Sequence, residues 1–228
     1  MSALAHWFEQ AGLHTVVIGL VKPHLETMRP PRALWVPFEL GRPLGPPGDQ
    51  AFQKRVLLAA LTLIETATAQ TLIDFDDDDP RSAPDPDWRA PATDDATSVS
   101  SELSQLQPAI TSFNEAFGRS SVGVAGLDLS QCASLVDETL ATGKPPASAD
   151  GGSALLQFRH ACDDLKAAWI EAALANGKPS SRQLHDWFWL QSQLGQSLRK
   201  LREQWLAGDD EKLAGIGARF IVPHRWRV

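Results

Sequence analysis

Hydrophobic and polar residues follow different patterns in the first 75 residues and in the rest of the chain. Short apolar runs predict three buried strands, at 14–20, 33–38 and 71–75. Amphipathic stretches predict helices before and between them, at 2–11, 22–28 and 49–67. Because helices and strands alternate in this order, we expect a small parallel three-stranded α/β part at the N-terminus.

From residue 99 onward, apolar residues recur at spacings of three and four, which is the pattern of amphipathic helices. The expected helices cover 103–117, with Pro108 as a candidate break, and 128–142, 155–172 and 184–205. The last two are joined by only a few residues, so we expect an antiparallel pair. The tail at 218–222 is expected to be a strand or an extended arm. The fold class is therefore α/β, with a mostly helical C-terminal part.

An acidic segment separates the two parts. Residues 74–95 hold nine Asp and two Arg, which accounts for the whole net charge of −7. Their composition favours an exposed linker, so we divide the chain into an α/β part (1–75), a linker (76–98) and a helical part (99–228). The run from Asp76 to Asp79 lacks the spaced ligands of a calcium loop, and no metal site is expected.

Several classes of protein are disfavoured by what the sequence lacks. It shows no signal-peptide pattern and no apolar run of membrane-spanning length, so we expect a cytoplasmic protein without a membrane partner. Outside the acidic segment the charges balance, which disfavours nucleic acid as a partner. No hydrolase, nucleotide-binding or dithiol motif is present, so no cofactor is expected and enzymatic activity is left open. Cys132 and Cys162 lie in apolar helical surroundings and are expected to be buried.

The loop from residue 36 to 45 is the candidate binding site. It follows a predicted buried strand, and ligands of open α/β sheets bind beyond the carboxyl ends of the strands. Gly41 is conformationally permissive, Glu39 supplies a carboxylate, and Arg42 supplies a guanidinium suited to a small carboxylate or amino-acid-like ligand. The alternative is a rigid turn in which Glu39 and Arg42 pair with local backbone. His24 follows the first strand and is expected at the same edge of the sheet.

Two segments resemble a known family. Residues 11–18 (AGLHTVVI) and 36–43 (VPFELGRP) are similar to the Ala-Gly-Ile-Pro-Thr-Val strand and the Pro-x-x-Leu-Gly-x-Pro loop of selenoprotein B. That protein is the substrate-side subunit of the glycine, sarcosine, betaine and D-proline reductases. The resemblance covers residues 3–65, the N-terminal third only. It implies that Pro37, Leu40, Gly41 and Pro43 are structural residues beside an active site.

The resemblance also implies reductive cleavage of a carbon–nitrogen bond by a selenocysteine or cysteine that lies shortly before the first helix. No cysteine precedes Cys132, and Met1 falls about where that motif would end. We therefore expect a reductase-family-like protein without its own redox nucleophile, acting with a protein partner or subunit that supplies the redox group. The alternative is a non-catalytic binding or protein-interaction module on a degenerate half of that fold.

Overall fold

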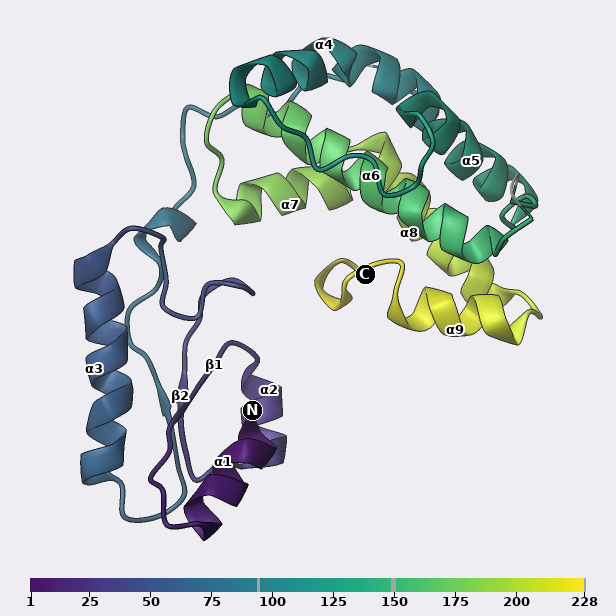
Figure 1. The fold of residues 1–228 in the computed structure, drawn as a ribbon. Coiled ribbons are helices and arrows are strands. Elements are labelled where there is room, and N and C mark those ends of the chain that lie inside the picture. Colours follow the sequence, from purple (N-terminus) through teal and green to yellow (C-terminus); the bar gives the residue numbers. More distant parts are fainter. Residues whose placement is uncertain (94, 149–150, 228) are drawn as a thin grey trace. The chain divides into compact units, whose positions relative to one another are not determined.

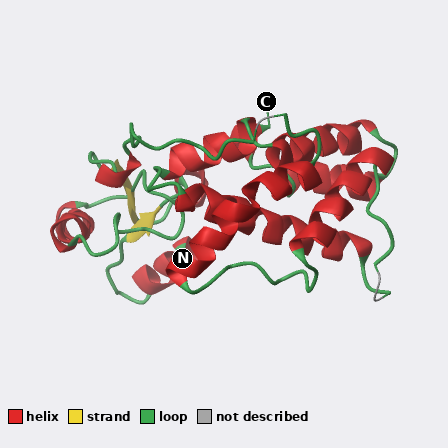
Figure 2. Cartoon of the chain, turned by 90° about the horizontal axis from the view of Figure 1, so that it is seen from above, coloured by secondary structure: helices red, strands yellow, loops and turns green. Residues whose placement is uncertain are grey.

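The computed structural model describes residues 1–93, 95–148 and 151–227, and the chain divides into two compact units. Met1–Ala83 form an α/β unit and Pro84–Val228 form a helical unit. Figure 1 labels the elements of both units, and Figure 2 separates the strands of the first from the helices by colour. The border between the units lies inside the predicted linker.

Three short parallel strands form the centre of the α/β unit, in the order β1-β2-β3. They are β1 (Val17–Gly19), β2 (Arg32–Trp35) and β3 (Thr71–Asp74). The helices are α1 (Ser2–Gln10), α2 (Lys22–Met28) and α3 (Gln50–Thr66), and a short 3₁₀ helix (Pro80–Ser82) follows β3. The predicted small parallel sheet is therefore confirmed, although each strand is shorter than the apolar run that predicted it.

The two faces of this sheet carry different helices. Side chains alternate between the faces of a strand, and Leu34 and Val36 belong to the same buried cluster as Phe52 of α3. On the opposite face, a Cβ added to Gly19 would lie 2.6 Å from the side chain of Leu25, so α2 packs closely on the strand here and a larger residue would displace Leu25. Figure 1 accordingly shows α3 on one side of the strands and α1 and α2 on the other.

The helical unit is built from six α-helices among the described residues, followed by a 3₁₀ turn (His224–Trp226). They are α4 (Val99–Phe117), α5 (Leu129–Thr142), α6 (Ala154–Ala175), α7 (Ser181–Leu190), α8 (Gln193–Ala207) and α9 (Glu211–Arg219). Each begins after a Ser or Asp whose side chain accepts a hydrogen bond from a backbone N–H of the first turn. These N-cap residues are Ser98, Asp128, Ser153, Ser180, Ser192 and Asp210.

The breaks between helices differ from the prediction in two places. Pro108 does not interrupt α4, because it is exposed and the helix carbonyl that loses its donor, Ser104, is exposed too. The second helix of the predicted pair is instead divided after Leu190. There the Ser192 hydroxyl donates to the Phe188 carbonyl at 2.7 Å and accepts from Gly195 N–H at 3.0 Å, which ends α7 and starts α8. The antiparallel pair consists of α6 and α7 (Figure 1).

Of the two forms expected for the C-terminal tail, the structure shows the arm and not the strand. No strand forms at 218–222: α9 runs to Arg219, and the following residues Ile221 and Val222 are buried in the core of the helical unit. The tail is held there by polar contacts as well. Trp226 donates from its indole N–H to Asp186 at 3.1 Å and stacks on Trp189. The basic end is therefore a docked arm.

Residues 84–93 pack on the helical unit, which differs from the exposed linker that their composition suggested. The Trp88 indole N–H donates to the carbonyl of Ala173 at 3.2 Å. The Gln183 amide accepts from Asp85 N–H and donates to its carbonyl, at 2.7 and 2.8 Å. A tryptophan and a two-point amide contact outweigh the disordering tendency of the acidic and proline residues around them.

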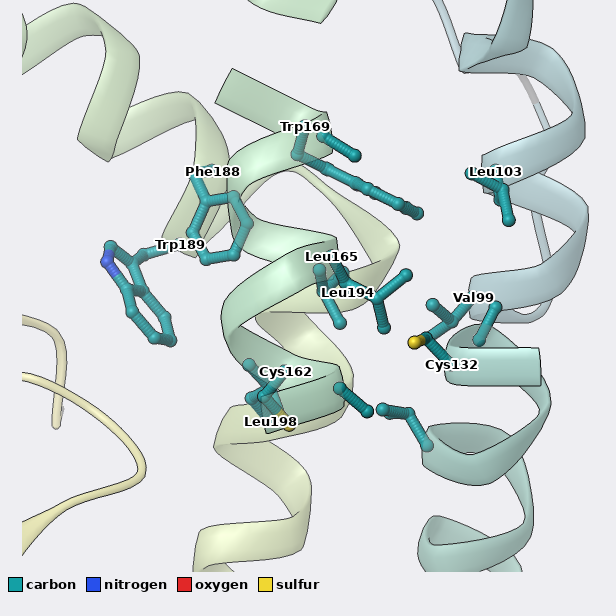
Figure 3. Packing of buried hydrophobic residues seen from close by; sticks show 14 of the residues in the cluster. Val99, Leu103, Cys132, Cys162, Leu165, Trp169, Phe188, Trp189, Leu194 and Leu198 are labelled. Atoms are coloured by element: carbon teal, nitrogen blue, oxygen red, sulfur yellow. The ribbon is translucent and has the colours of Figure 1, made fainter. Parts of the chain in front are cut away.

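The core of the helical unit surrounds α6. In Figure 3, Leu165 and Trp169 of α6 lie between side chains of α4 and α5 on one side and Phe188 and Trp189 of α7 on the other, and Leu194 of α8 lies beside Leu165. The buried Glu102 of α4 lies within this core and accepts from Trp169 Nε1 at 2.7 Å and from the backbone N–H groups of Gln193 and Leu194 at 2.8 and 2.9 Å. A carboxylate of one helix thus caps the start of another.

A second buried carboxylate holds a loop. Asp164 of α6 accepts hydrogen bonds from the backbone N–H groups of Gly123, Val124 and Ala125, all at 2.8–2.9 Å. The loop between α4 and α5 therefore directs three consecutive backbone N–H groups at a side chain of the protein itself. Within the described residues, no helix has both the length and the apolar character that crossing a membrane requires.

Candidate functional site

The predicted site lies where the three parallel strands end. Because the strands are parallel, the residues after Gly19, Trp35 and Asp74 meet at one edge of the sheet. His24 lies in the first turn of α2, directly after β1, and is exposed. It is therefore at the expected edge, but no hydrogen bond or ion pair joins it to a described residue of the 36–45 loop.

The loop after β2 folds into two consecutive turns. Arg42 N–H donates to the Glu39 carbonyl and Gly45 N–H donates to the Arg42 carbonyl, both at 3.0 Å. Gly41 has a φ of 92°, a left-handed conformation that favours glycine. The side chains of Glu39 and Arg42 are exposed, and Arg42 forms no ion pair with a described residue.

The charged groups that do interact at this edge are different ones. Lys22 forms an ion pair with Asp74 and lies over the Trp35 ring, 4.9 Å from its centroid. Trp35 in turn donates from its indole N–H to the Leu20 carbonyl. Beneath the loop, three phenylalanine rings pack edge to face with centroids 5.4–6.0 Å apart: Phe38, Phe52 and Phe75. These contacts join the ends of the three strands to one another at this edge.

Neither cysteine offers a reactive thiolate. Cys132 and Cys162 are free and buried in the helical unit, on α5 and α6 (Figure 3). Burial raises the pKa of the Cys132 thiol to about 11, and the nearby Asp164 and Asp128 contribute to this rise. Burial raises the pKa of Cys162 to about 12. Both thiols stay protonated near neutral pH, which makes them poor nucleophiles.

A cavity of about 430 Å³ opens between α6, α8, α9 and the C-terminal arm, and we call it the α6–α9 pocket. Its volume lies within the range of small-molecule sites. The buried side chains of Phe158, Cys162 and Trp205 contribute to its wall, with Phe158 and Trp205 in aromatic contact at 5.7 Å. The other apolar lining residues are Leu155, Leu156, Ile216, Phe220 and Ile221.

Three cationic side chains and one carboxylate line the same pocket, an excess of two positive charges. Arg159 lies 3.9 Å from Asp163 and is mostly exposed, so this pair is near the mouth. Lys166 lies over the ring of Trp189, at 5.6 Å. Lys212 is exposed and forms no ion pair with a described residue. An apolar cavity whose lining carries an excess of positive charge suits an apolar molecule that ends in an anion.

Sequence reasoning missed this pocket because its walls come from distant segments. One signal was present: on α6, Arg159 and Lys166 share a stripe with Leu155 and Cys162, so cations interrupt an apolar face. The opposite wall belongs to α9, which was not predicted, and to the C-terminal tail, which was expected only as a strand or an extended arm. The described residues contain no group of three or more His, Cys, Asp or Glu side chains placed to hold a metal ion.

No protein-family model matches this chain, and no curated protein or solved structure matches it. The fold and the pocket therefore define the class by themselves: a small parallel α/β unit followed by a helical unit that contains an apolar pocket with cationic residues at its walls.

Proposed function

We propose that this chain is a non-catalytic binding protein whose α6–α9 pocket takes a small apolar carboxylate, such as a medium-chain fatty acid. The observation that carries the proposal is the pairing of an apolar cavity of about 430 Å³ with an excess of cationic side chains along its lining. The proposal follows the binding-module alternative that the sequence left open.

Two physical effects would contribute to binding, one to affinity and the other to selectivity. Burial of the alkyl chain against Phe158 and Trp205 supplies most of the affinity, at about 0.8 kcal/mol per methylene group. The cations contribute less to the affinity, about 0.2–1 kcal/mol for an exposed ion pair. Their role is to favour an anionic head group over a neutral or a cationic one. Lys212 is best suited to this role, since it forms no ion pair with any residue that the structure describes.

The two buried thiols support a non-catalytic interpretation. A reductase of the resembled family needs a selenocysteine or a low-pKa cysteine, whereas both cysteines here have raised pKa values and lie in the helical unit. The α/β unit contains no cysteine at all.

A reductase-type role with a partner that supplies the redox group is the second proposal. It is favoured by the exposed Arg42 and Glu39 on a tight loop beyond β2, where a small amino-acid-like carboxylate would bind. Betaine or proline binding that is lost in Arg42→Ala, and kept in the exposed control Arg119→Ala, would support this second proposal over the first.

Isothermal titration calorimetry with octanoate tests the first proposal. We expect one octanoate per chain, with weaker binding of 1-octanol and of octylamine, which have the same chain but a neutral or a cationic head. The variant Ile216→Trp, which fills the pocket from α9, should weaken octanoate binding at least tenfold. Lys212→Glu should weaken it about fivefold, equivalent to ~1 kcal/mol.

Lys200→Glu is the matched control, because Lys200 is exposed on α8 and does not line the α6–α9 pocket. It should leave octanoate binding unchanged. Equal affinity for octanoate and 1-octanol would show that the carboxylate is not recognised. Binding that Ile216→Trp leaves intact, or no binding of any of the three molecules, would refute the pocket as the site.

A further inference from the structure

The helix α3 has two apolar faces, of which only one is covered. Its inner face packs on the sheet through four buried residues, Phe52, Val56, Ala60 and Leu63. Its outer face carries three leucines that are 42%, 52% and 54% exposed: Leu57, Leu58 and Leu61. A single exposed leucine is ordinary, but three neighbours on one helix surface form a patch that a partner would cover.

Charged residues stand at both ends of this patch. Lys54 precedes the leucines and Glu65 follows them, and both are exposed. Neither forms an ion pair with another described residue. The positions 54, 58, 61 and 65 are separated by four, three and four residues, which is the spacing of a helix–helix seam. The stripe that they define lies opposite the buried face of α3.

The order of charges along the stripe selects the partner. When two copies of α3 pack antiparallel about a two-fold axis between Ala59 and Ala60, position 54 of one copy lies opposite position 65 of the other. Position 58 then lies opposite position 61. Lys54 therefore meets Glu65 of the second copy at each end, and four leucines meet in the middle. A parallel arrangement would instead place Lys54 against Lys54 and Glu65 against Glu65.

We propose that two copies of this chain associate through the outer faces of their α3 helices, in an antiparallel and two-fold symmetric arrangement. Such an interface is isologous, because the same patch serves both partners. The contact is limited to one helix from each copy, so the association is a reversible monomer–dimer equilibrium and not an obligate assembly. This proposal does not rest on ligand binding in the helical unit.

Sedimentation equilibrium at micromolar to millimolar concentrations tests this proposal. The wild-type chain should show a concentration-dependent dimer. Leu58→Asp should abolish it, because two carboxylates would then enter the apolar centre. Since position 58 lies on the exposed face, circular dichroism should show an unchanged fold. Leu190→Asp alters an exposed leucine of the helical unit and should leave the dimer intact.

A charge exchange tests the antiparallel order. Lys54→Glu should weaken the dimer at least tenfold, because it places a second carboxylate opposite Glu65, and Glu65→Lys should weaken it equally. The double variant Lys54→Glu/Glu65→Lys restores opposite charges and should recover the wild-type dimer. Failure of this rescue would overturn the antiparallel pairing. A wild-type chain that stays monomeric throughout, or a dimer that the α3 variants leave unchanged, would overturn the interface itself.

Discussion

The helical unit covers more of its apolar surface than the α/β unit does, and it caps more of its helices. All six α-helices of the helical unit carry a side-chain N-cap, but among α1, α2 and α3 only α3 does, through Asp49. Of the eighteen large hydrophobic side chains that are exposed among the described residues, twelve belong to the smaller α/β unit and six to the helical unit. The α/β unit therefore leaves more large apolar side chains uncovered, although it is the smaller of the two.

Carboxylates are also used differently in the two units. In the helical unit, Glu102 and Asp164 are fully buried and accept N–H donors from distant segments. In the α/β unit, Glu9 is partly exposed and accepts from Thr15 and Arg32 at the edge where the strands begin. Burial is the main influence on Glu102 and raises its pKa. Burial also acts on Glu9, but its hydrogen bonds and Arg32 together lower its pKa.

The largest expected effect is the removal of Glu102. Glu102→Leu leaves the Trp169 indole N–H and two backbone N–H groups of α8 without partners inside the core, which should cost about 3–5 kcal/mol of unfolding free energy. Urea unfolding, monitored by hydrogen exchange, should show this loss of unfolding free energy in the helical unit alone. Glu115→Leu, on the exposed side of the same helix, should change the stability by less than about 0.5 kcal/mol. Equal losses in both variants would contradict the capping role.

A smaller effect is expected at Asp164. Asp164→Ala removes the acceptor of three backbone N–H groups, but the loop can turn these groups toward water, so we expect a loss of about 2 kcal/mol. Exchange protection should fall at Gly123, Val124 and Ala125 before it falls elsewhere. The neighbouring Asp163→Ala, at an exposed carboxylate, is the control and should leave this loop protected. An unchanged loop in Asp164→Ala would mean that packing alone holds it.

The smallest effect is expected at Glu9. The direction in which its contribution to stability changes with pH can be compared with that of Glu102. Because the pKa of Glu9 is lowered below 4.5, its stabilisation is present above that pH and is lost as the pH falls through the folded-state pKa. Glu9→Gln should cost the α/β unit ~1 kcal/mol at neutral pH and remove this acid sensitivity. Glu26→Gln, at an exposed carboxylate of α2, is the matched control.

The pH response of Glu102 should have the opposite sign. Its raised pKa means that its stabilising contribution is complete below 4.5 and declines as the pH rises through the folded-state value. Hydrogen exchange at several pH values would separate the two units. Two results would contradict this expectation. One is that acid lowers the stability of the helical unit through Glu102, and the other is that Glu9 leaves the stability of the α/β unit unchanged in acid.

Much of the fold was predictable because its signals are local. The cap at Asp49, the apolar stripe of α3 and the serine before α7 each act within one or two turns of helix. Pro108 misled the prediction because a proline tolerated on an exposed helix face has the same local signature as one that ends a helix. The division between α7 and α8 depends on a serine hydroxyl bonded to both sides, which the continuous apolar seam concealed.

The candidate sites were predictable to different degrees. The 36–45 loop follows β2 at the edge where the sequence placed it, because a parallel sheet brings the ends of its strands together. The pairing of Lys22 with Asp74 across 52 residues was not predictable, and neither was the α6–α9 pocket. Both depend on which segments become neighbours in space.

The sequence by itself determined most of the helices, the three apolar runs that become strands, the caps at Asp49 and Ser180 and the leucine positions of α3, because these depend on residues within a few positions of one another. Only the tertiary structure decided what the polar groups of the core do. Glu102 accepts from the N–H of Leu194, which lies 92 residues later in the first turn of α8, and Cys162, which was expected to be buried, becomes part of the wall of the α6–α9 pocket. The physical reason is burial: it sets the pKa and the partners of a side chain, and it is a property of the packed chain.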